Sequence, residues 1–244
     1  ASLISRIPAK NRLADFPHYL MHRAEQLENL YIFKNTEGTP ENIRKFHPNI
    51  IVSSTGSAPL LPPITGLKDR IDNENYNIYS ILGMISHIND FPKDLEGKKV
   101  VVVGGGAVGL DVVEFFADRN ADISIVEMMD QIGRDLDPVS KNDTKTMMKK
   151  HNVHQLTKTA LLEVKDSSFL VKGDGEPYEL PFEYGFVCLG MRAQGQLYQN
   201  LTEEFSSEDV EIMNIGDSQR ARRIIDGTQE GRNILTILEQ RGYL

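Results

Sequence analysis

Short apolar runs alternate with stretches of helical periodicity along most of this chain. Four consecutive valines end at Val103, directly before three glycines, and residues 107–120 then carry apolar side chains at helical spacing. Residues 121–127, "ADISIVE", predict a second strand, and a further helix is expected over 137–150. Strands and helices that alternate in this way predict an α/β fold with a parallel sheet.

The rest of the pattern predicts elements on both sides of this central region. Thr39 is expected to cap a short helix that begins at Pro40. Three prolines within residues 57–66 predict a crossover between two domains that lacks regular strand pairing. The other predicted elements are helices over 12–29, 80–90 and 222–241, strands over 31–35, 49–56, 184–190 and 210–217, and a β-meander over 153–181.

Gly104, Gly106 and Gly109 form a G-x-G-x-x-G motif between a predicted strand and a predicted helix. The first glycine allows a tight turn, the second lets the backbone approach a pyrophosphate, and the third lets the helix pack closely on the sheet. The pyrophosphate is expected at the N-terminal amides of the helix, where the helix dipole favours an anion. A glycine-rich turn without a ligand is the alternative. The predicted NAD-binding residues of this loop are Gly104, Gly105, Gly106, Ala107, Val108 and Gly109.

A carboxylate, Glu127, ends the second predicted strand at the spacing of about twenty residues that is typical of a ribose-binding acid. We predict that it accepts hydrogen bonds from the adenosine ribose hydroxyls. A carboxylate at this position repels the 2′-phosphate of NADP, and the following Met128 and Met129 offer no positive charge. NAD is therefore the expected cofactor, with Arg134 as the residue that could reverse this preference.

Composition excludes several classes of function. The 244 residues are 40% hydrophobic and carry a formal net charge of −8, which argues against a nucleic-acid or anionic-membrane surface. No apolar run approaches the ~20 residues that a bilayer requires, and the N-terminus lacks a signal segment. The single cysteine, Cys188, excludes an internal disulfide, a four-cysteine zinc site and a cysteine-held cluster. The single cysteine makes a reducing cytoplasm the expected location. His18 and His22 could chelate a metal, but they lack the Glu of H-E-x-x-H and are interpreted as a surface pair, so no metal site is expected.

Two further phrases, "IVSSTGSAP" and "IMNIGDSQRARRIIDGTQEG", resemble the markers of flavoproteins with paired dinucleotide-binding domains. In such proteins a T-G step marks the exit from the FAD domain, and a G-D step marks the return of the chain to it. The resemblance implies that Thr55, Gly56, Gly216 and Asp217 contact FAD, with Asp217 bonded to the ribityl chain. The resemblance also implies that the NAD domain is inserted between these two markers, so the glycine motif lies near the middle of the chain.

The phrases "FPHYLMHRAEQL", "PLLPPITG", "GKKVVVVGGGAVGLDVVEFFADRNADISIVE" and "DSQRARRIIDGTQEG" together resemble the C-terminal portion of the NADH:flavin oxidoreductases. That family includes 2-enoate reductases, 2,4-dienoyl-CoA reductases and trimethylamine dehydrogenase. The resemblance implies a Rossmann-like NAD-binding domain inserted into a partial FAD-binding domain. The expected boundaries are a first FAD-domain part over 1–75, an NAD-binding domain over 76–199 and a returning FAD-domain segment over 200–244.

This sequence also departs from the family. The family's chains begin with a TIM barrel that carries FMN and a 4Fe–4S cluster, and their FAD domain opens with its own strand–G-x-G-x-x-G–helix. Neither pattern precedes Lys98, and the chain has no initiator Met. We therefore expect a C-terminal fragment of a larger enzyme, whose partner is the N-terminal barrel of the same parent chain. Homo-oligomerisation stays open.

The resemblance assigns the chemistry to cofactors, because hydride passes from NADH to FAD without a protein acid or base. No catalytic residue is therefore expected. Gly190 ends a predicted strand at the carboxyl edge of the sheet, where ligands bind, and Arg192 matches a position of the family. Both are expected to border the nicotinamide, with a plain strand end as the alternative for Arg192. Arg223 is assigned to FAD, with the barrel or solvent as alternatives. Asp111 is expected either near the nucleotide or in a structural hydrogen bond.

Three functions follow from these expectations. The first is an oxidoreductase part that binds NADH and passes electrons through FAD to the barrel's FMN, where an enoate-type substrate is reduced. The second is a non-catalytic module that holds NAD or ADP as a structural ligand, as in an amine dehydrogenase. The third is a free-standing reductase that uses a partner's flavin. We expect the first, and NADH oxidation with an artificial acceptor separates it from the second.

Overall fold

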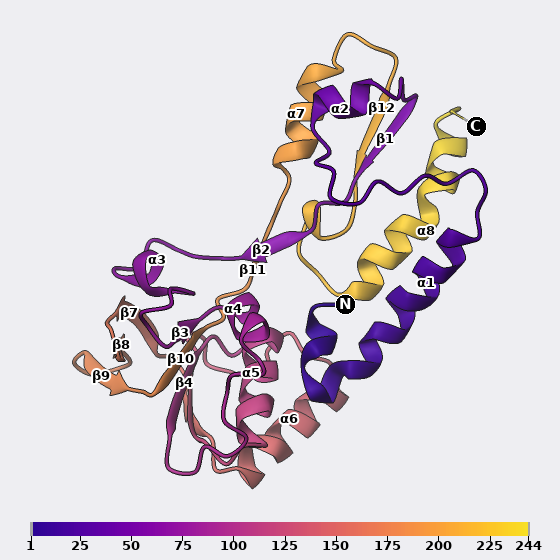
Figure 1. Ribbon diagram of the computed structural model, residues 1–244. Coiled ribbons are helices and arrows are strands. Elements are labelled where there is room, and N and C mark those ends of the chain that lie inside the picture. The colour runs from indigo at the N-terminus through magenta and orange to yellow at the C-terminus, as the bar shows by residue number, and fades with distance from the viewer. Residues whose placement is uncertain (1, 244) are drawn as a thin grey trace. The chain divides into compact units, whose positions relative to one another are not determined.

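The computed structural model describes residues 2–243, and its strands and helices alternate along the chain (Figure 1). The predicted α/β class with a parallel sheet is confirmed. The helices are α1 (Asp15–Glu25), α2 (Pro40–Arg44), α3 (Leu67–Arg70), α4 (Ile81–Ser86), α5 (Ala107–Ala117), α6 (Pro138–Lys150), α7 (Gln196–Glu204) and α8 (Ile224–Gln240), with 3-10 turns at Ile4–Arg6, Pro8–Ala14 and Gly216–Ser218. The strands are β1 (Ile50–Ser53), β2 (Ser57–Pro59), β3 (Ile78–Tyr79), β4 (Lys99–Val103), β5 (Asp122–Val126), β6 (His154–Leu156), β7 (Ala160–Val164), β8 (Ser168–Lys172), β9 (Tyr178–Pro181), β10 (Tyr184–Val187), β11 (Met191–Ala193) and β12 (Glu211–Asn214).

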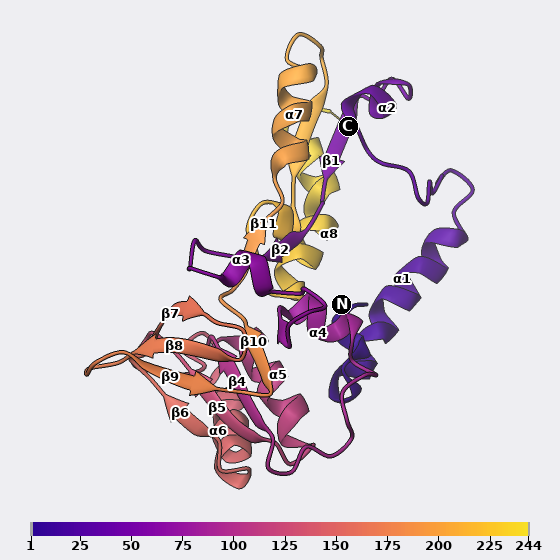
Figure 2. The same cartoon turned by 60° about the vertical axis from the view of Figure 1, so that its left-hand side comes forward.

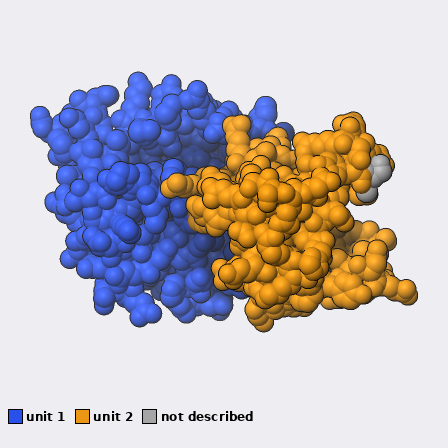
Figure 3. All heavy atoms as spheres, turned by 90° about the horizontal axis from the view of Figure 1, so that it is seen from above, with its two compact units in different colours: residues 1–18, 59–190 blue, residues 19–58, 191–244 orange. Residues whose placement is uncertain are grey.

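The chain divides into two compact units, which Figure 3 colours separately. Unit 1 runs to His18 and resumes over Pro59–Gly190, whereas unit 2 comprises Tyr19–Ala58 and the chain from Met191 onward. Residues 59–190 therefore interrupt unit 2 along the sequence. The predicted domain boundaries lie elsewhere, at 75/76 and 199/200, and as limits of functional domains they stay a prediction.

A five-stranded sheet forms the centre of unit 1, with the strand order β3-β10-β4-β5-β6 and parallel pairing throughout. The valines of β4 alternate between its two faces, because successive side chains of a strand point in opposite directions. Val101 and Val103 belong to one core cluster, and Val102 lies against the α5 side, near Gly109. All four valines, Val100 included, are at most 2% exposed, as expected for a parallel strand covered on both faces.

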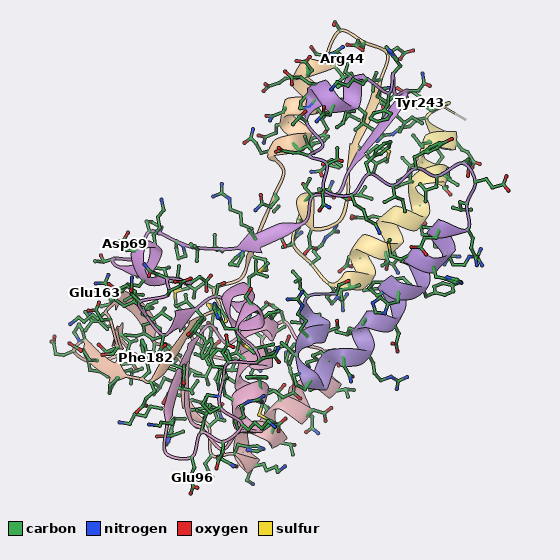
Figure 4. All side chains as sticks on the ribbon, in the orientation of Figure 1. Arg44, Asp69, Glu96, Glu163, Phe182 and Tyr243 are labelled. Carbon is green, nitrogen blue, oxygen red and sulfur yellow. The ribbon has the colours of Figure 1, made fainter. Side chains whose placement is uncertain are left out.

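The meander β7-β8-β9 is antiparallel and can be followed beside the sheet in Figure 2. Phe169 and Phe182, the latter labelled in Figure 4, have ring centroids 4.5 Å apart. Both rings belong to the cluster that contains Val101 and Val103, so the meander covers the sheet face opposite α5. The predicted meander is present, but its first residues form β6 and join the parallel sheet instead.

Unit 2 contains a two-stranded parallel sheet in which β1 pairs with β12, with Ser53 opposite Asn214. Ile51, Leu201 and Phe205 form its buried core. Arg44, which Figure 4 labels near α2, has its guanidinium 4.6 Å from the Phe205 ring centroid and 2.7 Å from the Glu204 carboxylate. This small core positions the ends of β1 and β12 at one sheet edge.

Two predictions about the elements need correction, and not every element was predicted. Residues 31–35, predicted as a strand, lie in extended and turn conformations without strand pairing, and the Tyr31 side chain is 78% exposed. A strand requires a neighbour to satisfy its backbone groups, and unit 2 offers residues 31–35 none. The proline-rich crossover was predicted to be free of regular pairing, yet β2 pairs with β11. Helix α7 was not predicted.

Other local signals were interpreted correctly. Thr39 caps α2, where its hydroxyl oxygen accepts a hydrogen bond of 3.2 Å from the Asn42 N–H. The helix predicted over 137–150 is present as α6, and Asp137 caps it through bonds of 3.0 and 3.1 Å from the Val139 and Ser140 N–H groups, a role that was not predicted. Among the described residues, no helix combines the length and the apolar character that a membrane crossing requires.

Candidate nucleotide-binding site

The glycine loop follows β4 and has little space around its first and last glycine. Gly104 has φ +109°, a conformation that side chains rarely adopt, and a Cβ there would lie 2.1 Å from the Cys188 carbonyl oxygen. A Cβ on Gly109 would lie 1.9 Å from the Gly104 carbonyl oxygen. These two positions therefore require glycine for the fold itself, whether or not a nucleotide is bound.

Gly106 differs from both, because a Cβ built on it meets nothing within 4 Å and its φ of −78° suits any residue. It is the N-cap of α5, and the first helical hydrogen bond runs from the Leu110 N–H to its carbonyl at 3.0 Å. The N–H groups of Ala107, Val108 and Gly109 therefore have no partner within the helix. No side chain caps this end and no acid lies in its first turn. Open space beside free amides fits a phosphate group.

The predicted acid lies directly beside this loop. One oxygen of Glu127 accepts a hydrogen bond of 2.6 Å from the Gly105 N–H, and the other accepts one of 2.8 Å from the Met129 N–H. A carboxylate oxygen can accept more than one bond, so both retain capacity for a ribose hydroxyl. Gly105 is held from its other side too, since its carbonyl accepts a bond of 2.7 Å from the Gly133 N–H. The structure thus brings Glu127 and the glycine loop together.

The residues after Glu127 are open to solvent. Met128 is 68% exposed and Met129 is 39% exposed, so this side of the site is apolar at its surface. Arg134 lies exposed in the turn that follows. The structure assigns it no bond to Glu127, and the expected preference for NAD stays a prediction.

The chain after β10 lies next to the glycine loop. The Cys188 N–H donates a hydrogen bond of 2.7 Å to the Val103 carbonyl, so the carboxyl ends of β4 and β10 lie side by side. This edge is where ligands of doubly wound sheets bind. Burial, aided by the charges of Asp111 and Asp72, raises the pKa of Cys188 to about 12, so its thiol stays protonated and inert near neutral pH.

Gly190, predicted to border the nicotinamide, ends this segment. It has φ +102°, and its carbonyl accepts a hydrogen bond of 2.9 Å from the Leu60 N–H. Space is open around it, because a Cβ there meets nothing within 4 Å. Arg192 lies exposed on β11 in unit 2.

The predicted FAD residues gather within unit 2. Because β1 and β12 are parallel and in register, the T-G and G-D steps follow the same edge of their sheet. The Thr55 hydroxyl donates to the Gln194 carbonyl, and the Gly56 carbonyl accepts a bond of 2.9 Å from the Gln194 N–H. Gly56 and Gly216 have φ of +78° and +65°, so both turns depend on glycine.

Asp217 accepts hydrogen bonds from two different segments of unit 2. Its two oxygens accept hydrogen bonds of 3.1 Å each, one from the Ser57 hydroxyl and one from the Arg222 N–H. The Gly216 N–H donates to the Glu230 carboxylate at 2.6 Å, and Glu230 also pairs with Arg222. The carboxylate of Asp217 is therefore fixed in orientation by two donors from different segments.

Arg223 does not lie against these residues through its side chain. It is the N-cap of α8, its guanidinium is 3.6 Å from the Asp226 carboxylate, and its side chain is 80% exposed. The exposed side chain agrees with the solvent alternative for Arg223, and its assignment to FAD stays a prediction. His18 and His22 are exposed on α1, and within the described residues no group of three or more His, Cys, Asp or Glu side chains could hold a metal.

Several residues of these sites were missed from the sequence. Ser57 and Glu230 hold the G-D turn, and Gln194 holds the T-G turn. Their partners lie between 14 and 160 positions away, and no local pattern marks such contacts. Lys10, which pairs with Asp111 on α5, was missed for the same reason.

A parallel sheet with a glycine loop, free helix amides and an adjacent acid defines a dinucleotide-binding protein. The chain belongs to the pyridine nucleotide-disulphide oxidoreductase family, which it matches over residues 27–213. It is thus a flavin- and pyridine-nucleotide-dependent oxidoreductase domain. The predicted fold class, with a Rossmann-like NAD-binding domain inserted into a partial FAD-binding domain, agrees with this family and is confirmed.

Individual relatives extend the comparison. The chain is 27% identical to a metal reductase of Desulforamulus reducens over 90% of its own length and 36% of the relative's length. It is 26% identical to an NADH oxidase of Thermoanaerobacter brockii over 78% of its own length and 28% of that protein. The chain therefore spans about a third of the length of the relatives it matches.

A solved structure of 2-naphthoyl-CoA reductase shares the fold. It superposes with a TM-score of 0.76 at 21% identity, over 94% of this chain and 33% of that protein. Together with the family match, this confirms the resemblance to the FAD/NAD-binding portion of larger flavin oxidoreductases.

Proposed function

We propose that this chain is the nucleotide-binding part of a larger NADH-dependent flavin oxidoreductase. It binds NADH along the glycine loop and Glu127, and it delivers electrons through FAD to an FMN- and iron–sulfur-containing barrel of the same parent chain. The barrel reduces an enoate-type substrate. The relatives are named for different acceptors, a metal in one and bilirubin in another, and this chain spans about a third of each. We infer that the acceptor site lies in the part of such proteins that this chain does not match.

One observation carries the NADH assignment. Gly106 is open and unstrained, whereas its neighbours Gly104 and Gly109 have no room for a side chain. The fold alone does not require glycine at Gly106, but a pyrophosphate at the α5 amides does. Glu127 supports NADH over NADPH, because its carboxylate is held beside the loop by two N–H donors.

The residues of unit 2 fit part of a flavin nucleotide. Asp217 presents an oriented carboxylate that can accept hydrogen bonds from ribityl hydroxyls, and Thr55 and Gly56 lie on the same sheet edge. The sequence contains a single G-x-G-x-x-G, which the NAD site uses. We infer that this chain supplies the ribityl side of the FAD site and that another segment of the parent protein supplies its phosphate loop.

The residues of the chain bind and orient. With both cofactors bound, FAD would be the hydride acceptor for NADH, so the chain would need no acid or base of its own. The α5 amides fix the diphosphate, Glu127 fixes the adenosine end, and the open backbone at Gly190 leaves space for the nicotinamide. The buried thiol of Cys188 beside Gly104 stays protonated, because burial raises its pKa to about 12, so it supplies no thiolate to this site.

A second candidate function is a non-catalytic module that holds NAD or ADP. The observation that favours it is the parallel sheet of unit 2, which has two strands where a complete dinucleotide-binding sheet has more. Under this hypothesis the glycine loop serves assembly and not turnover. Oxidation of NADH by the parent protein with an artificial electron acceptor supports the first function and contradicts the second.

The experiment on the chain itself combines two titrations. NADH and NADPH are titrated calorimetrically into the purified chain, and visible spectra are recorded before and after addition of FAD. We expect NADH to bind, NADPH to bind at least about tenfold more weakly, which is about 1.4 kcal/mol, and FAD not to be retained. Absence of NADH binding contradicts the proposal. Retention of FAD contradicts the inference that another segment completes the flavin site.

A further inference from the structure

Lys10 forms a clasp with two carboxylates of α5. It lies in the 3-10 turn Pro8–Ala14, and its Nζ is 3.2 Å from Asp111 Oδ1 and 3.0 Å from Glu114 Oε2. The three side chains are between 25% and 38% exposed, so the charges are partly shielded from water. All three residues belong to unit 1.

The two carboxylates lie close to the proposed phosphate site. Asp111 follows Ala107 by four residues and Val108 by three, so it shares their face of α5 one turn further along. With a rise of 1.5 Å per residue, its Cα lies about 6 Å along the helix axis from that of Ala107. Glu114 lies one turn further on the same face. Without a counter-charge, these two acids would place a negative field behind the amides that meet the diphosphate.

The Lys10 ammonium carries the positive charge that balances the carboxylates of Asp111 and Glu114. Burial lowers the pKa of Lys10, but the carboxylates of Asp111 and Glu114 outweigh burial, and the pKa is raised above its ordinary value. The ammonium is therefore charged at neutral pH. Burial raises the pKa of Asp111, and the Lys10 ammonium offsets only part of this effect. Loss of Lys10 would leave Asp111 partly buried without its partner.

We propose that Lys10 is a positioning residue of the NADH site, whose ammonium neutralises Asp111 and Glu114 so that the dinucleotide diphosphate meets the α5 amides without a net negative charge behind them. This inference rests on the proposed function, because it assumes that NADH binds at α5. The alternative is a purely structural role, in which Lys10 only anchors the N-terminal turn beside the buried Ile7, which is 1% exposed.

The test compares three variants by NADH calorimetry at two salt concentrations, with thermal unfolding in parallel. Lys10→Met keeps most of the length of the side chain and removes its charge. We expect NADH to bind about tenfold more weakly, which is about 1.4 kcal/mol, with a smaller loss at high salt. Lys10→Arg keeps the charge and is expected to retain most of the affinity. Lys165→Met is the matched control, because it breaks a 2.6 Å ion pair with Glu179 on the meander and leaves the clasp intact.

The double variant Asp111→Asn, Glu114→Gln separates charge balance from anchoring. It breaks the clasp but leaves the Lys10 ammonium unopposed, so neutralisation predicts NADH affinity equal to or tighter than that of the wild type. A structural anchor predicts weaker binding and a lower unfolding temperature. Weaker NADH binding by the double variant, or unchanged binding by Lys10→Met, overturns the inference. A wild-type chain that binds no NADH contradicts the proposed function itself.

Discussion

The Glu127 carboxylate accepts a hydrogen bond of 2.6 Å from the Gly105 N–H, across a separation of 22 residues. The same carboxylate accepts a second bond from the Met129 N–H. The acid expected to bind the ribose therefore also joins the end of β5 to the glycine loop. Its two roles can be separated by experiment.

Replacement of Glu127 by Ala is expected to lower both stability and NADH affinity. Two charge-assisted bonds to backbone amides are lost, each worth about 1.5–3 kcal/mol. Glu127 is only half-buried, so water replaces part of each bond, and we expect a net loss of about 2–4 kcal/mol in the free energy of unfolding. Urea denaturation measures the stability and calorimetry the affinity. Glu176→Ala, at an exposed turn, is the control and should change neither. An unfolding free energy equal to that of the wild type would show that the two bonds contribute nothing.

Gly106 and Gly109 are expected to respond differently to substitution. Gly106→Val has open space for the side chain, so the protein should fold normally and lose NADH binding by more than about tenfold. Gly109→Ala forces a Cβ to within 1.9 Å of the Gly104 carbonyl, and we expect a loss of about 3 kcal/mol or more in stability. Unfolding curves and NADH titrations of both variants check this contrast. Full NADH affinity in folded Gly106→Val would rule out the pyrophosphate at this position.

The thiol of Cys188 is expected to resist modification until the protein unfolds. Burial raises its pKa from 9.0 to about 12, so a thiol reagent at pH 8 should react with the denatured chain and not with the native one. Above pH 9 the unfolded thiol loses its proton while the folded thiol keeps it, so stability falls as pH rises from 9 toward 12. Comparison with Cys188→Ala isolates this contribution, since the variant should lose less stability across that interval. Rapid reaction of the native chain at pH 8 would contradict the buried placement.

The two hydrogen bonds that Asp217 accepts are expected to stabilise the G-D turn of unit 2. Asp217→Ala removes acceptors from the Ser57 hydroxyl and the Arg222 N–H, and we expect a loss of about 1–3 kcal/mol in stability. The amide proton of Arg222 should then exchange faster with solvent, which hydrogen-exchange NMR measures. Asp209→Ala, at an exposed position beyond α7, is the matched control. Unchanged exchange at Arg222 would mean that the turn does not depend on this carboxylate.

The central part of the fold could be predicted from the sequence because its signals are local. Four valines in a row require a strand covered on both faces, and the glycines that follow allow a tight turn into a helix. Thr39 and Asp137 mark helix starts through bonds to amides within three residues. Strand prediction failed at residues 31–35, because a strand exists only where a neighbour pairs with it. Apolar residues such as Tyr31 give no information about the presence of that neighbour.

The sequence by itself determined the glycine loop, the start of α5 and the acid that ends β5, since each depends on backbone geometry and spacing within one βαβ unit. The tertiary structure alone decided which residues far apart in the sequence come into contact in each unit. It placed the Cys188 carbonyl against Gly104, the Ser57 hydroxyl against Asp217, and the Lys10 ammonium between Asp111 and Glu114. These contacts join residues that are far apart in the chain. They depend on strand order and on the path of the chain between strands, which local periodicity does not encode.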